Sequence, residues 1–177
     1  MEEAEILLRN AMEHHGAAVY RLALCRMQSV QDAEDVYQDV FLRLLGQEAS
    51  AWDGEHLRAW LLRCTVNRCH DLHRFRLRRP VLPLDEALAC PVGEAAAELW
   101  EAVGVLPEKL RTAVHLYYAE GYQAEEIAAM LGVPAATIRT RLRRAREKLK
   151  SVLGGMEDAE QPVPEAASRA PRPGGAE

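Results

Sequence analysis

The sequence predicts an all-α fold of two small helical domains joined by a flexible linker. Apolar residues recur at spacings of three and four through most of the 177-residue chain, and no stretch alternates strictly as a half-buried strand would. A proline-containing acidic stretch, residues 80–93, separates two sets of such helical patterns. We therefore expect an N-terminal domain over residues 5–79, a linker over 80–93 and a C-terminal domain over 94–153.

The N-terminal domain is expected to contain three helices. An opening helix is followed by an amphipathic helix over residues 33–45. After a polar loop, residues 47–55, a long third helix begins near His56. The apolar residues at helical spacing that should form the core of this domain are Ala11, Val19, Leu22, Ala23, Val36, Val40, Phe41, Leu44, Leu45, Leu57, Trp60, Leu61, Cys64 and Leu72.

The C-terminal domain contains a helix-turn-helix pattern. Ile127, Ala128 and Leu131 lie at the inward spacing of a short first helix, and residues 132–134 (Gly-Val-Pro) end it. Ala135 then begins a second helix. The apolar residues that recur along this second helix and should form its buried stripe are Ile138, Leu142, Ala145 and Leu149.

A ladder of arginines lies on the second helix of this pattern. Arg139, Thr140 and Arg143 fall on or near the face opposite the apolar stripe, where they are free to enter a major groove. An ordinary amphipathic helix with a solvated basic face is the alternative. The turn, the stripe and the ladder occur together in helix-turn-helix register, which favours a DNA-reading surface.

The charge of the chain is unevenly distributed. The formal net charge is −5, yet residues 58–79 hold seven arginines against one aspartate, and residues 139–150 hold seven basic residues against one glutamate. The rest of the chain is therefore strongly acidic. Two basic segments in an acidic chain indicate two separate contacts with a polyanion, and they leave acidic surfaces for another partner.

Asp32, Asp35 and Asp39 lie close together on the second expected helix. Like charges at spacings of three and four residues destabilise an isolated helix slightly. The preference for acids at a helix start accounts for Asp32 but not for Asp39. Two interpretations stay open: the cluster binds a partner with a basic surface, or it forms a solvated face.

Trp52 stands in the polar loop of residues 47–55. A tryptophan in such a loop either folds back on the core or provides a platform on which an unpaired base stacks. Arginines alternate with apolar residues at the end of the long third helix and can follow a phosphate backbone. Among them Asn67 and Asp71, one helical turn apart, would fix side-chain geometry or read bases. A solvated helix end is the alternative.

The cysteines and the missing catalytic motifs limit the function classes. The four cysteines form no CxxC pair, and no signal peptide or membrane-length apolar run occurs, so we expect a cytoplasmic protein with reduced thiols. Cys69 and His73, with Cys64 and His70 nearby, are candidate ligands for a soft metal, but no second ligand pair accompanies them. Without a phosphate loop, nucleophile elbow or HExxH motif, we expect no enzyme, no metal and no cofactor.

Three blocks of sequence together resemble a known family. AEDVYQDVFLRLL is followed by LRAWLLRCTVNRCHD, with arginines after it, and then by LPEKLRTAVHLYYAEGYQAEEIAAMLGVPAATIRTRLRRAREKL. In this order, with a linker between them, they resemble the sigma-70 family, and within it the small two-domain sigma factors of the extracytoplasmic-function (ECF) type. The resemblance covers residues 20–149. It implies an alternative sigma factor that binds core RNA polymerase and directs promoter-specific transcription initiation.

The resemblance also assigns roles to residues of this chain. The surface for the clamp of the largest polymerase subunits would comprise Asp35, Gln38 and Asp39. The residues of the region 2-like domain that would melt and capture the −10 element are Trp52, Asn67, Asp71, Arg74 and Arg76. The residues of the region 4-like helix-turn-helix that would read the −35 element are Thr137, Arg139, Thr140, Arg143 and Arg144. Core polymerase and promoter DNA are the implied partners, and an anti-sigma factor is a further candidate.

Two features stand apart from the family pattern. Gln123 occupies the position at which a hydroxylic residue usually opens the first short helix of the motif, and it is a poorer cap. Residues 154–177 are rich in Pro, Ala, Gly and Glu, and we expect them to be disordered. Two alternatives remain: a sigma-like regulator that binds DNA or polymerase without opening promoters, and a transcription regulator that senses a metal or the state of its thiols.

Overall fold

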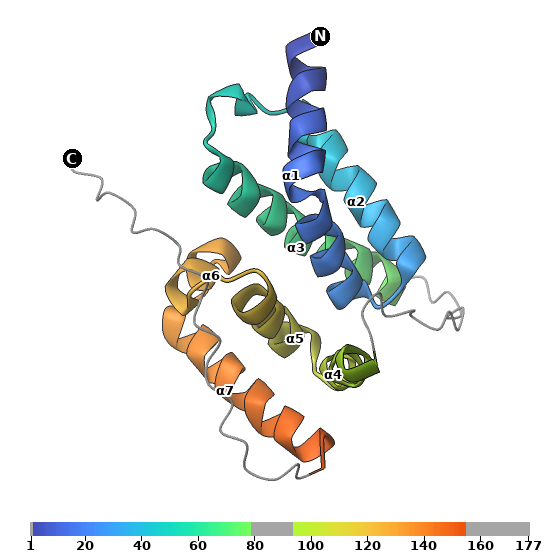
Figure 1. Cartoon of the computed structure of the whole chain (residues 1–177), viewed down its shortest axis with the longest axis vertical. Coiled ribbons are helices and arrows are strands. Elements are labelled where there is room, and N and C mark those ends of the chain that lie inside the picture. Colours follow the sequence, from blue (N-terminus) through green and yellow to red (C-terminus); the bar gives the residue numbers. More distant parts are fainter. Residues whose placement is uncertain (1, 79–93, 155–177) are drawn as a thin grey trace, which may run out of the picture.

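The computed structural model describes residues 2–78 and 94–154. These two segments contain helices and turns and no strand, which confirms the all-α prediction. The expected linker lies outside the described residues, as does the expected disordered tail beyond Gly154. Figure 1 shows the chain as two groups of helices lying against each other, with α7 on the edge remote from α1 and α2.

Three long helices and a 3-10 turn form the first group: α1 (Glu2–Met27), α2 (Val30–Leu45), η1 (Ala49–Ala51) and α3 (Gly54–Arg78). Both α2 and α3 begin earlier than the apolar periodicity predicted, because polar side chains cap them. The Ser29 hydroxyl accepts a hydrogen bond from the Asp32 N–H at 3.3 Å, and the Asp53 carboxylate accepts one from the His56 N–H at 2.6 Å. Each cap satisfies one of the N–H groups that a helix start leaves unpaired.

The core of the first group closely follows the expected apolar positions. Val19, Leu22, Val36, Val40 and Leu61 are fully buried. Trp60 and Leu72 are half-buried and pack against this core. The prediction for the last residue of α2 was wrong: Leu45 is 47% exposed, because the helix ends there and the chain turns away through Gly46.

Four α-helices and a π-helical turn form the second group: α4 (Glu94–Val105), α5 (Glu108–Val114), η2 (His115–Ala119), α6 (Ala124–Leu131) and α7 (Ala135–Val152). Helices α6 and α7 form the predicted helix-turn-helix. Gly132 ends α6 at φ 67°, a left-handed conformation that costs glycine little, and the Val133 N–H donates to the Ala128 carbonyl at 3.1 Å. Gln123 is the N-cap residue of α6, and its N–H donates to the Glu126 carboxylate at 2.9 Å.

The two groups share a hydrophobic core. Ala18 and Leu22 of α1 and Leu62 of α3 are buried in the same cluster as Leu116 and Ile127 of the second group. Trp100 of α4 packs in turn against the core of the first group. The sequence predicted two domains joined through a linker. In the structure, the two groups of helices are in addition packed against each other.

Candidate nucleic-acid interface

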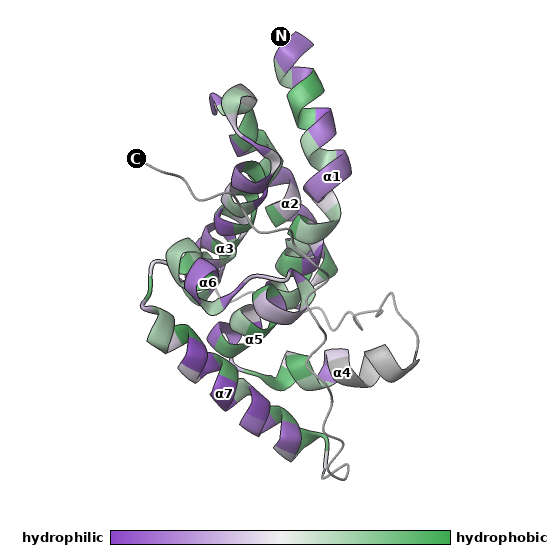
Figure 2. Cartoon of the chain, turned by 60° about the vertical axis from the view of Figure 1, so that its left-hand side comes forward, coloured by the Kyte–Doolittle hydropathy of each residue, from purple (hydrophilic) through white to green (hydrophobic). Residues whose placement is uncertain are grey.

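Helix α7 has one apolar and one basic face. Ile138, Leu142 and Ala145 are buried against the rest of the second group, which confirms the inward stripe, and Leu149 is half-buried. The residues on or beside the outward face are Thr137, Arg139, Thr140, Arg143 and Arg144; the three arginines are exposed and the two threonines half-buried. Figure 2 shows hydrophilic residues running along α7 at the edge of the molecule. A helix presented in this way can enter a major groove without changing the fold.

Two of these arginines are held by carboxylates of their own domain. Arg139 pairs with Glu125 of α6, and Arg143 pairs with Glu147 one turn along α7 at 3.2 Å. All four side chains are more than half exposed. Exposed pairs of this kind are worth about 0–1 kcal/mol, so phosphates or base edges can replace the carboxylates at little cost. The arginines are therefore oriented in the free protein and remain available.

Along α3 the structure brings together three of the predicted residues. Asn67, Asp71 and Arg74 are exposed and follow one another at spacings of four and three, so they form one stripe on the helix. Trp52 precedes α3, which begins at Gly54. The rise of the helix places Asn67 about 20 Å along α3 from Gly54. The candidate residues thus lie along a line rather than in one pocket.

Arg76 is separated from this stripe. It lies on the other side of α3 and pairs with Asp32 of α2, whose side chain is buried. Arg68 pairs in the same way with Asp39 of α2. These two pairs join α2 to α3. Two of the three clustered aspartates, Asp32 and Asp39, therefore have arginine partners within the chain. The sequence pattern did not reveal these partners.

Asp35 and Gln38 remain exposed on the outer side of α2. Gln38 also lines a groove of about 590 Å³ between α1 and α2, together with Met12, Tyr20 and Tyr37. Of the three residues predicted to bind polymerase, Asp35 and Gln38 are thus presented outward, and Asp39 is engaged by Arg68. The outward surface of α2 is acidic with an apolar groove beside it.

Trp52 is half-buried and folds back on its neighbours. Its ring stacks on His56 with centroids 4.7 Å apart and the planes tilted by 18°, and it meets Trp60 at 5.5 Å. It also packs against the core of the first group. One face of the indole is therefore covered by an exposed histidine, which a base would have to displace before stacking there.

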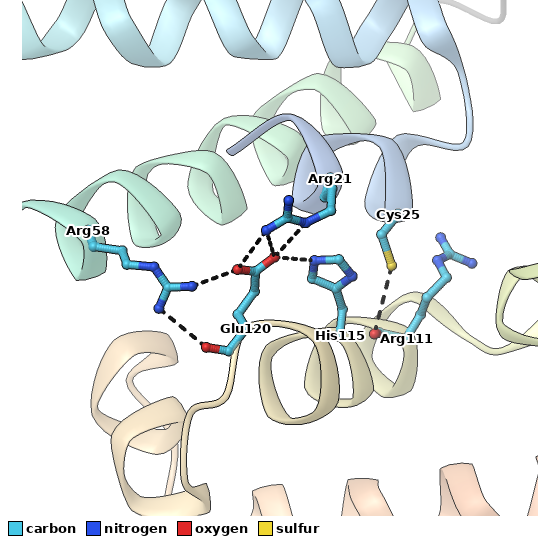
Figure 3. Close-up of polar contacts among 6 residues, drawn as sticks. All are labelled: Arg21, Cys25, Arg58, Arg111, His115 and Glu120. Atoms are coloured by element: carbon cyan, nitrogen blue, oxygen red, sulfur yellow. Dashed lines mark hydrogen bonds and ion pairs between the residues drawn. The ribbon is translucent and has the colours of Figure 1, made fainter. Parts of the chain in front are cut away.

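A polar cluster that the sequence did not predict lies between the two groups of helices. We call Arg21, Arg58, His115 and Glu120 the Glu120 cluster. The Glu120 carboxylate has no exposed surface and accepts contacts from Arg21 at 3.2 Å, from Arg58 at 2.7 Å and from His115 at 3.1 Å. Figure 3 shows the arginines reaching it from α1 and α3 while His115 reaches it from its own domain.

Burial and hydrogen bonding oppose each other in this cluster. Burial by itself would raise the pKa of Glu120, but the hydrogen bond and charge of His115 and the charges of Arg21 and Arg58 lower it below its usual value. Burial likewise disfavours protonated His115, yet hydrogen bonds to Cys25 and Glu120 raise its pKa to about 9. The cluster is therefore ionised around neutral pH. Its members are 5 to 99 residues apart, so sequence spacing carried no signal for it.

A second set of contacts lies beside the Glu120 cluster. Arg26 of α1 is buried and pairs with Glu108 and Thr112 of α5. The Arg111 side chain donates to the backbone carbonyl of Arg26 at 3.0 Å, near the end of α1 at Met27. A cation at a helix C-terminus is favoured by the helix dipole and satisfies a carbonyl that the helix leaves unpaired.

Two of the cysteines, Cys64 and Cys69, are poor candidates for the metal and thiol alternatives because both are buried. Burial raises the pKa of Cys69 to about 12 and raises that of Cys64 as well, so neither readily forms the thiolate that metals and oxidants require. His73 faces Glu108 at 3.8 Å. Residues 2–78 and 94–154 contain no group of three His, Cys, Asp or Glu side chains arranged to hold a metal ion. In the same segments no helix is both long and apolar enough to cross a bilayer.

Comparison with known proteins accounts for both halves of the chain. Residues 11–79 match the model of Sigma-70 region 2, and residues 96–149 match that of Sigma-70 region 4. The ECF RNA polymerase sigma factor SigM of Mycobacterium tuberculosis is 32% identical over 146 residues, which cover 79% of this chain and 74% of SigM. The chain belongs to the ECF sigma factors. This sigma factor is accordingly a transcription initiation factor that acts with core RNA polymerase on promoter DNA.

Other relatives agree with this assignment. The ECF sigma factor SigW of Bacillus subtilis is 29% identical and covers 76% of this chain and 82% of SigW. Among solved structures, the sigma factor RpoE of Bartonella quintana, crystallised with the anti-sigma factor NepR, matches with a TM-score of 0.72 and 26% identity over 82% of this sigma factor and 95% of RpoE. The similarity extends across both helical groups, so the two-domain architecture is that of the family.

Proposed function

We propose that this sigma factor recognises its promoter at two places, the −35 element through α7 and the −10 element through α3 and the loop before it. The observation that carries the proposal is the two-faced α7, buried through Ile138 and Leu142 and presenting oriented arginines outward. Arg139, Thr140 and Arg143 would approach base edges, with Thr137 and Arg144 beside them. Polymerase performs the chemistry, and this chain directs where it begins.

The proposed −10 surface is the stripe of Asn67, Asp71 and Arg74 together with Trp52. The support is exposure: the stripe faces solvent, and arginine beside exposed amide and carboxylate groups can contact phosphate and an unstacked base edge. Arg76 belongs to this proposal in a second role. By holding Asp32 it would fix α3 against α2, so that the stripe keeps its direction.

The proposed polymerase surface is the outer side of α2. Asp35 and Gln38 are exposed there, and the groove beside them offers apolar area for a partner helix. Asp39 would contribute indirectly, through its contact with Arg68. Because polymerase and template are cytoplasmic in bacteria, we place the action of the chain there. We also propose an anti-sigma factor as a regulatory partner, because RpoE of Bartonella quintana was solved with one.

Run-off transcription with purified core polymerase on fragmented genomic DNA tests the function and identifies the promoter. We expect discrete start sites that require the chain. Arg143→Ala should weaken promoter-specific transcription by about 10- to 100-fold, the effect of losing about 1–3 kcal/mol of base contact. Its binding to core polymerase should not change. The matched control is Arg9→Ala, which removes another exposed arginine from an i,i+4 pair. Equal loss in the two variants would contradict the role of Arg143.

A further inference from the structure

Helix α6 carries two consecutive glutamates with different partners. Glu126 accepts a hydrogen bond from the Gln123 N–H at 2.9 Å and so caps its own helix. Glu125 instead pairs with Arg139 of α7, 14 residues further along the chain. Both side chains of this pair are exposed, Glu125 by 64% and Arg139 by 59%. Glu125 therefore neither caps α6 nor fills the core, and the reason for its position lies at the surface.

The Glu125 carboxylate is held by its own helix as well as by Arg139. Glu125 is the second residue of α6, where the helix dipole favours an acid. A hydrogen bond from its own backbone N–H, together with the one from Arg139, lowers the pKa of Glu125 below its usual value. Helix α6 is fixed in turn by Ile127 and Ala128, which are buried. The carboxylate is thus a charged acceptor on a rigid support, and such an acceptor can direct another side chain.

Arg139 lies where a recognition helix reads bases. It follows the start of α7 at Ala135 by four residues, and the N-terminal residues of a recognition helix are those that contact base edges. The contact with Glu125 uses the Nη2 group of Arg139. A guanidinium has further N–H donors in the same planar fork, and these can reach O6 and N7 of a guanine together. Arg139 can therefore keep its carboxylate and bind a base.

Arg143 is held in a different way. Its partner, Glu147, lies one turn closer to the C-terminus of the same helix. Of these two arginines, Arg139 is the one whose direction is set from another helix of the motif. The two exposed pairs are therefore not equivalent, and the pair formed by Glu125 is the one that joins the two helices of the helix-turn-helix.

A carboxylate at a DNA-binding surface lowers the affinity for every sequence, because it repels phosphates. It can nevertheless raise selectivity. An arginine without a partner can turn to a phosphate, and that contact carries no sequence information. Holding the guanidinium removes this alternative. It also removes the cost of ordering a long side chain on binding, which corresponds to about two- to tenfold in affinity. Selectivity gains from both effects, since one weakens the wrong complexes and the other strengthens the right one.

We propose that Glu125 determines specificity in the −35 interaction by positioning Arg139 for a guanine, without touching DNA itself. This inference rests on the proposed function of α7. The ligand that follows is a duplex with a G·C pair opposite Arg139. Removing the Glu125 carboxylate should broaden the preference at that one base pair and raise the affinity for unrelated sequences.

Holoenzyme assembled from core polymerase and the full-length chain tests the inference on a library of randomised duplexes. Sequencing of the bound duplexes gives the base preference at each pair, and Arg139→Ala identifies the pair that Arg139 reads. Glu125→Ala should reduce the preference at this same pair by about two- to tenfold. Adding Glu125→Ala to Arg139→Ala should reduce it no further, because the two residues act as a unit. Glu5→Ala, which removes another exposed carboxylate paired with an arginine, is the control and should match the wild type.

Two conservative variants separate position from charge. Glu125→Gln keeps the length of the side chain and offers a carbonyl oxygen to Arg139, whereas Glu125→Asp keeps the charge on a side chain one methylene shorter. If Glu125 positions Arg139, the glutamine variant should retain more of the preference than the aspartate variant. The opposite order would mean that Glu125 acts only by repelling phosphates, and it overturns the inference.

The remaining outcomes distinguish this inference from the proposed function. If Arg139→Ala loses the preference at one pair and Glu125→Ala keeps it, the role of Glu125 is overturned and reading of the −35 element by Arg139 stands. If the wild type enriches no sequence, or if Arg139→Ala gives the wild-type profile, both are overturned.

Discussion

Trp52 illustrates how one side chain can serve both the fold and the ligand. Its packing against Trp60 and the core resembles that of a structural residue, yet the face toward His56 is covered only by an exposed side chain. Stacking on an unpaired base is worth about 1–3 kcal/mol, which is enough to displace one aromatic contact at the surface. The structure therefore leaves a role in trapping the opened strand compatible with a role in packing.

Trp52→Ala separates these roles. If the indole captures a base, the variant should lose open-complex formation on duplex promoter and regain activity on a template carrying a pre-melted bubble, since melting is no longer required. Permanganate footprinting of duplex and bubble templates measures both. His56→Ala should retain activity on duplex DNA, because it only uncovers the indole. An indole that serves packing alone would give a destabilised variant that the bubble does not rescue.

His115 connects the folded state to pH. Its pKa is raised from 6.5 to about 9, so the protonated form is favoured in the folded protein. That contribution to stability is complete below about pH 6.5 and is lost as the pH rises to about 9. Glu120, whose pKa is lowered, contributes above about pH 4.5 and loses its contribution in more acidic solution. The cluster is therefore most stabilising at mildly acidic pH.

Denaturant unfolding at a series of pH values measures this dependence. We expect the free energy of unfolding of the wild type to fall by on the order of 1–3 kcal/mol between pH 6.5 and 9. His115→Gln should be less stable at pH 6.5 and should lose most of that slope, because the imidazole whose pKa is raised is removed. The other groups around it, Arg21, Arg58 and Cys25, remain in place. An unchanged slope in the variant would show that other groups titrate in this range.

At the scale of elements, the helix-turn-helix depends on a backbone conformation as much as on its apolar stripe. Gly132 ends α6 at φ 67° and nothing lies within 4 Å of where its Cβ would be, so an added methyl group meets no neighbour. The cost of a substitution there is therefore conformational only. It amounts to about 1–2 kcal/mol for an L-residue in the left-handed region.

Gly132→Ala should lower the free energy of unfolding by that amount and leave the affinity of the folded protein for a −35 duplex unchanged. Gly54→Ala is the matched control. Gly54, the first residue of α3, also has open space around it, and its φ lies outside the left-handed region, so alanine should be neutral or slightly stabilising. Thermal unfolding monitored by circular dichroism compares the two. Equal destabilisation of the two variants would show that the left-handed conformation of Gly132 is not the cause.

Local patterns predicted these elements well because each rests on residues close together in sequence. The stripe through Ile138 and Leu142, and the turn at Gly132, follow from periodicity and glycine chemistry alone. The pairs Arg68–Asp39 and Arg76–Asp32 could not be predicted from local patterns, because the two residues of each pair are 29 and 44 residues apart, on different helices. Two arginines of the basic segment 58–79, which the sequence predicted to contact a polyanion, are thus paired with aspartates of the same chain.

At the scale of the whole molecule, opposite charges are assigned to different surfaces. Helix α7 presents arginines on one edge, whereas the outer side of α2 carries exposed acids such as Glu34 and Asp35. A net charge of −5 disfavours indiscriminate binding to nucleic acid, and complementary patches steer each surface to its own partner.

Asp35→Lys tests this division of surfaces. Asp39 is bound to Arg68, so changing it would also loosen α2 from α3, whereas Asp35 is exposed and its substitution leaves the fold intact. A lysine should repel the basic surface that we expect on the polymerase clamp and weaken core binding by about tenfold or more, with direct affinity for a −35 duplex unchanged.

Glu101→Lys, on the exposed side of α4, reproduces the change in net charge and should bind core as the wild type does. Fluorescence anisotropy with core polymerase and, separately, with the duplex measures both affinities. If the two lysine variants bind core equally well, α2 is not the docking surface.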